Sequence, residues 1–594
     1  MKRFWHPLFA GAALAAALVA SGPATADFKD RFSPLQPVAC AALAPDLTDN
    51  PVVKSATSEI IAASGPDVAR CQVDILYGTN PDQNINVRVG LPLNSLDGGT
   101  GGVEGAWNGR TQGIGGGGCS GSLNVTGPVN SGYVGSGNDT GHTGGDCEPG
   151  VNEDGTYNFQ FINDFIRNGI KAQVTFMKSV AGRYYGMKPA YNYWNGCSTG
   201  GRQGYLLAQE FGKELDGILA NAPAMYWTRF QTAQMWGQIV MKDLVGGPID
   251  EAKLSQATAS AVAACDTHDG VTDGVIDDPR TCTFSAAANV CGTSTAPAAE
   301  CLTPEEAEAI DLIWDGPRNA FGNKVWFGLE RGAQLGGSCI PGFGCFSLNG
   351  ILPFLLGVVQ FHWNEHDRNF DWHTVSTAGY AHVAQDGSRN IADVTDTFGN
   401  LDTFRRSGGK MLTFVGSSDQ LIMPRGVINY YRQMASRYDK HRDRKFSFGS
   451  HFRDGKDIDF DSVQRFYRLF RAPGVAHCGG GVGPQPQGLF DTLVDWVENG
   501  NAPERILATT AGDPGETRSR PLCPYPQTAI YNGSGSTDDA NSFHCGGNLE
   551  TTRTVCNDVL VKYKHEVNGH RDFTGTGVNW FECLNIDPRH GPPW

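Results

Sequence analysis

The sequence predicts an α/β fold in which a mainly parallel sheet is interrupted by a large inserted segment. Two observations support this prediction. Apolar strands and amphipathic helices alternate up to about residue 225, and a strongly apolar strand returns at 410–415. Between them, residues 226–405 are rich in Trp and Phe and lack that alternation. Strands that alternate with helices are typical of a parallel sheet with helical crossovers.

The elements before the insertion follow from their apolar spacing. Residues 71–92 contain two alternating runs, which predict an antiparallel strand pair at an edge of the sheet. The spacing over 159–185 predicts a long amphipathic helix, and residues 191–194 predict a short aromatic strand. A second helix is expected to reach about residue 211, before a buried strand at 216–221.

The glycine-rich region and the end of the chain complete this organisation. Residues 98–150 are rich in glycine but also contain Trp107, Cys119 and Cys147, which favours a folded loop region over a flexible linker. A helix at about 490–499 is expected as the last core element. The predicted segments are a signal peptide (1–26), a first core part (27–225), a lid (226–405), a second core part (406–530) and a disulfide-stapled tail (531–594).

The first residues predict export from the cell. Lys2 and Arg3 precede an apolar run over residues 8–19, and residues 24–26 (Ala-Thr-Ala) offer a cleavage site. The apolar run is too short to serve as a permanent membrane anchor. We therefore expect a cleavable signal peptide over residues 1–26 and a secreted or periplasmic protein.

Composition excludes some partners and indicates disulfides. The net charge of −15 argues against binding to nucleic acid or to an anionic membrane, because both would need a basic patch. Sixteen cysteines in an exported chain predict structural disulfides. Zinc would need closely spaced cysteine pairs of the Cys-x2-Cys kind, which the sequence lacks. The oligomeric state is left open.

Ser198 is the candidate nucleophile. It lies in Gly196-Cys197-Ser198-Thr199-Gly200, which fits G-x-S-x-G between a predicted strand and a predicted helix. Small flanking residues allow the sharp turn that exposes a nucleophilic serine, and the helix that follows points N–H groups at a reacting carbonyl. The motif also arises by chance in a glycine-rich chain, so its position between strand and helix carries the prediction.

Asp419 and His477 are the candidate partners of this serine. A serine hydroxyl needs a histidine base and a carboxylate that orients the base. Asp419 follows the strand at 410–415 in a Gly-Ser-Ser-Asp loop, and His477 lies in a turn-rich loop before the last core helix. The alternatives are a turn-capping aspartate and an ordinary hydrogen-bonded histidine. The order Ser, Asp, His along the chain favours the catalytic interpretation.

A pair of cysteines flanks the same candidates. Cys197 precedes Ser198, and Cys478 follows His477. If the two catalytic side chains are hydrogen-bonded, their sequence neighbours come close enough for a disulfide. Such a bond would hold base and nucleophile together, although either cysteine could also be an ordinary core thiol.

These motifs resemble a known family. N-G-C-S-T-G-G-R, the strand followed by G-S-S-D, and G-V-A-H-C-G-G-G are similar to those of the tannase and feruloyl esterase family, which includes the mono(2-hydroxyethyl) terephthalate hydrolases. The resemblance implies an α/β-hydrolase core with an inserted lid. It also implies that Ser198 is the nucleophile, His477 the base and Asp419 the residue that orients it, with Cys197 and Cys478 joined by a disulfide.

The oxyanion hole is expected to use the backbone N–H of Thr199 and one from the glycine-rich loop. The stretch G-G-G-G-C-S-G resembles the family's loop, and Gly117 is the preferred donor, with Gly116 and Gly118 as alternatives. Glycines let the backbone approach a substrate without obstruction from side chains.

A structural Ca²⁺ site is expected in the lid. Carboxylates of Asp266, Asp269 and Asp273, with the backbone carbonyls of Val271 and Val275, would supply oxygen ligands. The loop is not an EF-hand, because the closing glutamate is missing. The alternative is an acidic loop capped by turns, and likeness to the family's lid favours calcium.

The resemblance also implies disulfide pairs. Those it supports, together with the pair that flanks the acidic loop, are Cys40–Cys71, Cys265–Cys282, Cys291–Cys301 and Cys523–Cys545. Proximity alone suggests Cys119–Cys147, Cys339–Cys345 and Cys556–Cys583.

The predicted function is that of a secreted serine carboxylic-ester hydrolase acting on aromatic esters, of hydroxycinnamates or gallates, through an acyl-enzyme. Lid aromatic residues would contact the ring, although each could equally be packed in the core; the candidates are Trp363, Phe370, Trp372 and Phe398. Two alternatives are open: a mono(2-hydroxyethyl) terephthalate-type hydrolase, and a non-catalytic binding protein on the same fold. The complete Ser–Asp–His set argues against the last.

Overall fold

The computed structural model describes most of the chain from residue 36 to residue 550. It leaves out a set of short segments within this range: 101–105, 146, 295–296, 320–321, 341–343, 351–352, 392–398, 440–457 and 512–516. After residue 550 it describes only two short strands, β17 (Lys562–Tyr563) and β18 (Gly575–Thr576). The predicted signal peptide (1–26) lies outside the described residues, as do Cys556 and Cys583.

A nine-stranded sheet forms the core, in the order β1-β2-β3-β5-β4-β6-β7-β10-β11. Strands β1, β2, β3 and β5 pair antiparallel, and the strands from β5 through β11 pair parallel. The strands are β1 (Val53–Ile61), β2 (Arg70–Tyr77), β3 (Ile85–Pro92), β4 (Arg110–Ile114), β5 (Val134–Asn138), β6 (Tyr191–Cys197), β7 (Gly217–Asn221), β10 (Lys410–Gly416) and β11 (Tyr467–Ala472). The predicted antiparallel pair at 71–92 is confirmed as β2 and β3.

Helices cover both faces of this sheet. Successive side chains of a strand point to opposite faces, so apolar residues on both faces need to be covered. Trp194 and Ile218 pack into the larger apolar cluster, whereas their neighbours Tyr193 and Leu219 pack with Trp496 on the other face. The core helices are α1 (Cys40–Thr48), α2 (Thr126–Asn130), α3 (Phe159–Asn163), α4 (Gly169–Tyr185), α5 (Thr199–Glu210), α13 (Asp402–Arg406), α14 (Pro424–Tyr438), α15 (Asp461–Gln464) and α16 (Leu489–Asn499).

The predicted helix over 159–185 is divided in two. A π-helical turn over Asp164–Asn168 separates α3 from α4. The buried Asp164 carboxylate accepts a hydrogen bond from Gln83 Nε2 at 2.5 Å, so the turn is tied to the loop before β3. This long-range contact leaves no mark on the apolar spacing, which is why the spacing predicts one continuous helix.

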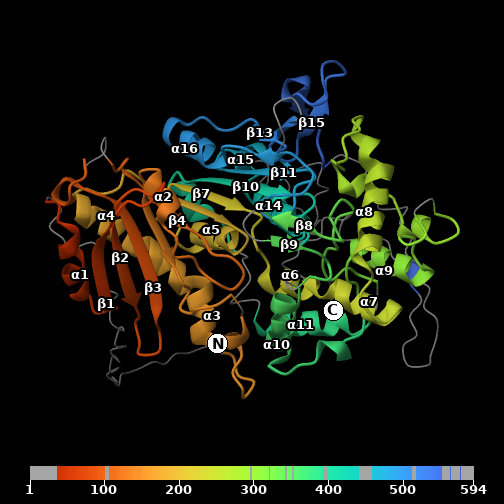
Figure 1. Cartoon of the computed structure of the whole chain (residues 1–594), viewed down its shortest axis with the longest axis horizontal. Helices are drawn as coiled ribbons and strands as arrows, with labels where there is room; N and C mark the ends of the chain where they lie inside the picture. Colours follow the sequence, from red (N-terminus) through yellow and green to blue (C-terminus); the bar gives the residue numbers. More distant parts are fainter. Residues whose placement is uncertain are drawn as a thin grey trace, which may run out of the picture.

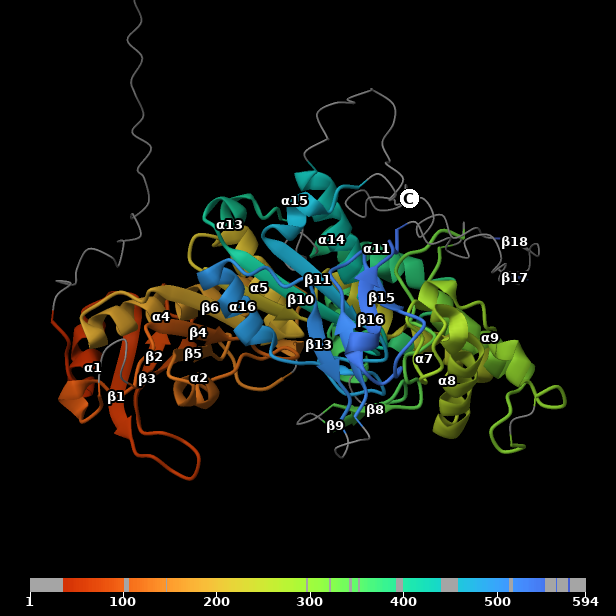
Figure 2. The ribbon, with the colours of Figure 1, turned by 90° about the horizontal axis from the view of Figure 1, so that it is seen from above.

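The chain between β7 and β10 forms the lid, which lies beside the sheet in two perpendicular views (Figures 1 and 2). Its elements are α6 (Trp227–Gln234), α7 (Trp236–Val245), α8 (Glu251–Cys265), α9 (Pro304–Asp315), β8 (Ser338–Ile340), β9 (Gly344–Phe346), α10 (Val359–Glu365) and α11 (Tyr380–Asn390). The architecture is therefore an α/β core with an inserted domain. The residue boundaries that divide core, lid and tail stay a prediction.

Short antiparallel strands follow the core. They are β12 (Gln485–Pro486), β13 (Ile506–Thr509), β14 (Ser519–Leu522), β15 (Thr528–Tyr531) and β16 (Phe543–Gly546). In Figure 2, β15 and β16 lie between β11 and α8. This segment therefore lies where the core meets the lid.

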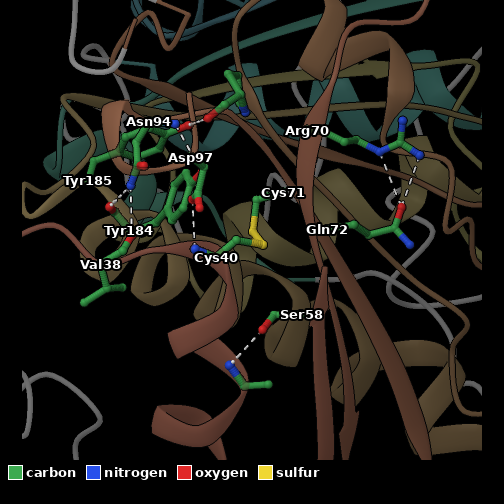
Figure 3. The surroundings of a disulfide bond; sticks show 12 residues. Val38, Cys40, Ser58, Arg70, Cys71, Gln72, Asn94, Asp97, Tyr184 and Tyr185 are labelled. Carbon is green, nitrogen blue, oxygen red and sulfur yellow. Dashed lines mark hydrogen bonds between the residues drawn. A yellow bond between two sulfur atoms is a disulfide. The ribbon is translucent and has the colours of Figure 1, made fainter. Parts of the chain in front are cut away.

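Disulfides hold several of these elements, as the sequence predicts. Figure 3 shows the bond between Cys40 at the start of α1 and Cys71 on β2. Asp97 accepts the N–H of Cys40 at 2.8 Å and the hydroxyl of Tyr184 at 2.7 Å, which ties α1 to α4 as well. The disulfides within the described residues are Cys40–Cys71, Cys119–Cys147, Cys197–Cys478, Cys265–Cys282, Cys291–Cys301 and Cys523–Cys545.

The remaining cysteine predictions are decided only in part. Backbone register places Cys339 on β8 opposite Cys345 on β9. Disulfides of this number are typical of proteins from oxidising compartments.

Among the helices that the structure describes, none is long and apolar enough to cross a membrane.

Candidate active site

Ser198 lies at a strained turn between β6 and α5. Its backbone has φ 61° and ψ −122°, a conformation that non-glycine residues rarely adopt. The flanking glycines are required by space. A Cβ on Gly196 would lie 2.4 Å from the carbonyl carbon of Gly200, and one on Gly200 would lie 2.9 Å from Gly115. The G-x-S-x-G motif therefore forms the turn that the sequence predicts.

His477 and Asp419 form a buried pair. His477 Nδ1 and Asp419 Oδ2 are 2.8 Å apart, and the two residues are 5% and 1% exposed. The other carboxylate oxygen accepts the N–H groups of Leu421 and Ile422 at 2.9 and 2.8 Å, which fixes the carboxylate. An ionised carboxylate only accepts hydrogen bonds, so Nδ1 carries the proton and Nε2 is the basic nitrogen.

The two loops come together because of the sheet topology. Asp419 follows β10 and His477 follows β11, which are adjacent parallel strands. Their carboxyl ends therefore meet at the same edge of the sheet, where open α/β sheets bind their ligands. Ser198 follows β6 at that same edge, since β6, β7 and β10 are parallel neighbours as well.

The Cys197–Cys478 disulfide joins the nucleophile turn to the histidine loop. Its Cα atoms are 5.9 Å apart, although the two residues are separated by 281 positions in the sequence. Because Ser198 and His477 are the immediate neighbours of the bonded cysteines, a covalent link holds both in one place. The structure confirms this predicted pairing.

Gln420 is a further residue of this site, and no sequence motif pointed to it. Its Oε1 accepts the backbone N–H of His477 at 3.2 Å. The adjacent Ser418 N–H is donated to the carbonyl of Val475 at 3.0 Å. The loop that carries the acid therefore holds the loop that carries the histidine from two points. A glutamine beside an aspartate is a weak sequence signal, because only the fold brings it to His477.

The oxyanion prediction needs one correction. The N–H of Gly117 is already donated to Ser120 O at 3.1 Å, and that of Gly116 to Gln203 Oε1 at 3.0 Å. Gly117 is therefore the wrong donor in this conformation, because its N–H is used within the loop. The N–H and the hydroxyl of Ser120 both donate to the Gly117 carbonyl. In the trans peptide between Gly117 and Gly118, the Gly118 N–H points in the direction opposite to that carbonyl. Thr199 Oγ1 donates to Gly118 O at 2.5 Å, so Gly118 lies beside Thr199.

The predicted calcium loop is compact and acidic. Asp266 accepts three backbone N–H groups, from Asp273 (3.0 Å), Gly274 (2.9 Å) and Val275 (3.3 Å), and Asp269 accepts that of Val271 at 3.0 Å. Within the part of the chain that the structure describes, no three His, Cys, Asp or Glu side chains are arranged to hold a metal ion.

Two aspartates at this loop have raised pKa values. Burial, followed by repulsion from Asp273 and Asp266, raises the pKa of Asp269. Burial and the nearby Asp269 raise the pKa of Asp277 to about 7. Desolvation is the largest cause of both shifts, and Arg471 and Arg520 partly oppose that of Asp277. Oxygen donors of this kind suit Ca²⁺. The loop therefore offers ligand atoms of the chemical type that a hard cation binds.

Trp363 anchors the lid and packs in the core. It is fully buried, and a Cβ on Gly150 would lie 2.0 Å from its indole ring. Its Nε1 donates to the carbonyl of Cys147 at 3.0 Å. Trp363 therefore holds α10 against the loop that the Cys119–Cys147 disulfide joins to the glycine-rich segment. Of the other aromatic candidates, Phe370 and Trp372 are partly buried against the main core cluster, and Phe398 lies outside the described residues.

The order Ser198, Asp419, His477 after the parallel strands β6, β10 and β11 is that of an α/β-hydrolase, and this is the class to which the fold belongs. The chain belongs to the tannase and feruloyl esterase family, whose model matches residues 103–546. It is accordingly a carboxylic-ester hydrolase.

Individual relatives agree with this placement. A probable feruloyl esterase of Arthroderma benhamiae is 34% identical, over 74% of this chain and 80% of that protein. The mono(2-hydroxyethyl) terephthalate hydrolase of Piscinibacter sakaiensis is 28% identical, over 74% of this chain and 79% of that protein. The crystal structure of feruloyl esterase B from Aspergillus oryzae superposes with a TM-score of 0.69 at 22% identity, covering 86% of this chain and all of that one, and shows the shared fold.

Proposed function

We propose that this protein hydrolyses esters of hydroxycinnamic or gallic acids with Ser198 as nucleophile, His477 as base and Asp419 as the residue that orients the base. The observation that carries the proposal is the convergence of the three loops. A disulfide joins the neighbours of Ser198 and His477, and His477 Nδ1 lies 2.8 Å from Asp419. The probable feruloyl esterase at 34% identity supports the choice of substrate class.

The reaction follows from this geometry. His477 Nε2 takes the proton of the Ser198 hydroxyl as its oxygen attacks the ester carbonyl. The alkoxide that forms accepts the N–H groups of Thr199 and Gly118, which replaces Gly117 as the second donor. His477 then protonates the departing alcohol, and the acyl-enzyme remains on Ser198. A water molecule gives its proton to His477 and attacks the acyl group. His477 then returns this proton to the Ser198 oxygen as the acid leaves.

Two further parts of the proposal concern the lid and the destination of the chain. The aspartate loop would bind Ca²⁺ through Asp266, Asp269 and Asp273 with the carbonyls of Val271 and Val275. The ion would offset the crowded carboxylates and stabilise the lid, and it takes no part in the chemistry. Residues 1–26 would direct export, a role that agrees with the six described disulfides.

A substrate panel tests the enzymatic part. Methyl ferulate, methyl gallate and mono(2-hydroxyethyl) terephthalate are offered to the wild type and to Ser198→Ala. We expect the first or second to give the highest kcat/KM, and the variant to lose about 10³-fold or more while its circular dichroism is unchanged. Preference for the terephthalate monoester would instead favour the activity of the Piscinibacter relative. Undiminished turnover by the variant would exclude Ser198 as the nucleophile.

Metal analysis tests the calcium site. Removal of divalent cations with a chelator should lower Tm, and added Ca²⁺ should restore it better than Mg²⁺, because the loop offers flexible oxygen ligands. The control is Asp266→Asn, which should respond to neither treatment. A purified protein without bound metal and without a change in Tm would exclude the site.

A further inference from the structure

We propose that Arg518 is a positioning residue for His477: it clamps the histidine loop (residues 473–484) to the aspartate loop of the lid (residues 266–278). This inference rests on the proposed role of His477 as the base. It assigns a function to an arginine that lies 41 positions beyond that histidine in the sequence and belongs to neither loop.

Arg518 contacts both loops with one guanidinium group. Its Nη1 donates to the backbone carbonyl of Asp273, in the aspartate loop. Its Nη2 donates to the carbonyl of Val482, in the histidine loop, at 3.1 Å. The side chain is 14% exposed, and the bond to Asp273 is the more buried of the two. A planar guanidinium with donors fixed in a fork is suited to bridging two carbonyls.

The backbone of Arg518 is itself held in place. Its N–H donates to Thr510 Oγ1 at 2.9 Å, and its carbonyl accepts the N–H of Thr510 at 2.8 Å. These bonds continue the β13–β14 ladder, which includes the pair Thr509 and Ser519. The guanidinium therefore extends from a rigid base toward the two loops.

The two loops also touch each other directly. Gly474, at the start of the histidine loop, has φ 70°, and a Cβ there would lie 2.9 Å from the side chain of Val275. Any larger residue would separate the loops. This contact is at Gly474, three residues before His477. Arg518 binds the other end of the same histidine loop, at Val482.

The histidine loop is rigid enough to transmit this restraint. Gly483 N–H donates to Gly474 O at 3.0 Å and closes the base of the loop, and Ala476 N–H donates to Gly480 O at 3.1 Å. The Gln485 side chain braces the same loop from within, at Gly480 and Gly483. Val482 is 50% exposed, and its carbonyl is where Arg518 holds the loop from outside. Release at Val482 would let the segment that carries His477 shift against Asp419.

The expected catalytic effect is moderate. A displacement of about 1 Å can cost about 10²-fold in rate, but the disulfide at Cys478 and the bond to Asp419 limit how far His477 can move. We therefore expect Arg518→Met to lower kcat about 10-fold with KM nearly unchanged, because substrate binding is not altered. Arg518→Lys, which can still reach one carbonyl, should recover part of the loss.

Arg520 provides a matched control. It lies two residues further along the same strand and binds the Asp273 carboxylate at 2.6 Å, and its guanidinium packs over the Phe543 ring with 4.2 Å to the centroid. Its other hydrogen bonds in the described structure go to the carbonyls of Ser519 and Thr537. Arg520→Met should thus lower stability without changing kcat.

The test combines kinetics with hydrogen exchange on the full chain. In Arg518→Met, the amides of residues 475–482 should exchange at least about threefold faster than in wild type, and in Arg520→Met they should not. Unchanged exchange in Arg518→Met would overturn the clamp, whether or not the protein turns over any ester. Faster exchange with wild-type kcat would overturn the positioning role. Failure of the proposed function would appear separately, as an active Ser198→Ala.

Discussion

The nucleophile turn and the lid are held in place by different means. Ser198 is fixed by its own backbone, by glycines that allow no side chain, and by a covalent bond next to it. The lid is held to the core through side chains, such as Asp278, which contacts Arg471 of β11 at 3.1 Å. The backbone geometry of the turn is determined by neighbouring residues in the sequence, whereas charge pairs between core and lid join residues that are far apart in the sequence.

Because of this difference, we expect substitutions in the two regions to affect kcat and the free energy of unfolding differently. Atoms that react must be placed to within fractions of an ångström, and strained backbone with covalent restraint provides that placement. An inserted domain that holds none of the three candidate catalytic residues only needs to stay attached, and buried ion pairs can do this at a cost in desolvation. Changes near Ser198 should therefore lower kcat, whatever they cost in stability, and changes at the lid contacts should act mainly on the free energy of unfolding.

The largest effect is expected from Asp419→Asn. An amide can present its own N–H to His477 Nδ1 and so favour the wrong tautomer, which should lower kcat on the order of 10⁴-fold. Thermal unfolding by circular dichroism should change little by comparison. A loss of less than about 10-fold would mean that another group orients the histidine.

Removal of the disulfide beside the site comes next. Replacing Cys197 and Cys478 with serine frees a loop with a sequence separation of 281, which should cost about 5 kcal/mol in unfolding free energy and should also lower kcat. The control is the pair Cys291 and Cys301 in the lid, with a separation of 10, where about 3 kcal/mol and unchanged kcat are expected. Urea titration and steady-state kinetics measure both. Equal kcat in the two double variants would contradict the comparison.

Asp278→Asn should weaken the attachment of the lid. Burial alone would raise the pKa of Asp278, but Arg471 and Arg280 outweigh it and hold the pKa well below its usual range. The variant leaves two buried cations without their partner and should lose about 3 kcal/mol at pH 7.

The pH dependence of this loss has a definite sign. A carboxyl with a lowered pKa in the folded state stabilises that state fully above the unfolded pKa of about 4. The stabilisation decreases as pH falls below that value and is lost completely only below the lower folded-state pKa. Urea titrations at pH 7 and at pH 3 measure the difference between wild type and Asp278→Asn. A difference that does not shrink at pH 3 would show that the charge of Asp278 is not responsible.

The smallest effect is expected inside the lid, at Lys324. Burial lowers its pKa to about 7, and Asp315, at 3.7 Å, only partly offsets that burial. Between about pH 7 and pH 10 the unfolded chain binds the extra proton, so wild-type stability should rise with pH in this window. Lys324→Met removes that slope and should gain about 1 kcal/mol at pH 7, while Arg318 still pairs with Asp315. Parallel urea titrations of both proteins at pH 7 and pH 9 would show wild-type stability rising relative to that of the variant, and a constant difference would refute the assignment.

Much of the site could be predicted because each part has a local signature. G-x-S-x-G between a strand and a helix located Ser198, and the loop after an apolar strand located Asp419. The cysteines next to Ser198 and His477 indicated their own disulfide, which the structure contains. These signals can be recognised in a single sequence because each requires particular residues at adjacent positions.

Other parts depended on partners that sequence spacing does not identify. Gly117 was preferred as an oxyanion donor, yet its N–H is donated to Ser120 O. Trp363 was a candidate for substrate contact, but it is fully buried and donates to Cys147 O, 216 positions away. Composition could indicate that these residues matter, without showing which neighbours they meet.

By itself the sequence determined the α/β class, the three candidate catalytic residues and the export-compatible cysteine pattern. Each of these is fixed by hydrophobic periodicity or by short motifs that chain geometry demands. Only the tertiary structure decided that Gln420 holds the backbone of His477, that the Gly117 N–H is donated to Ser120 O, and that Arg518 bridges Asp273 and Val482. The reason is physical: hydrogen bonds act over about 3 Å, and folding alone brings residues from distant parts of the chain within that range.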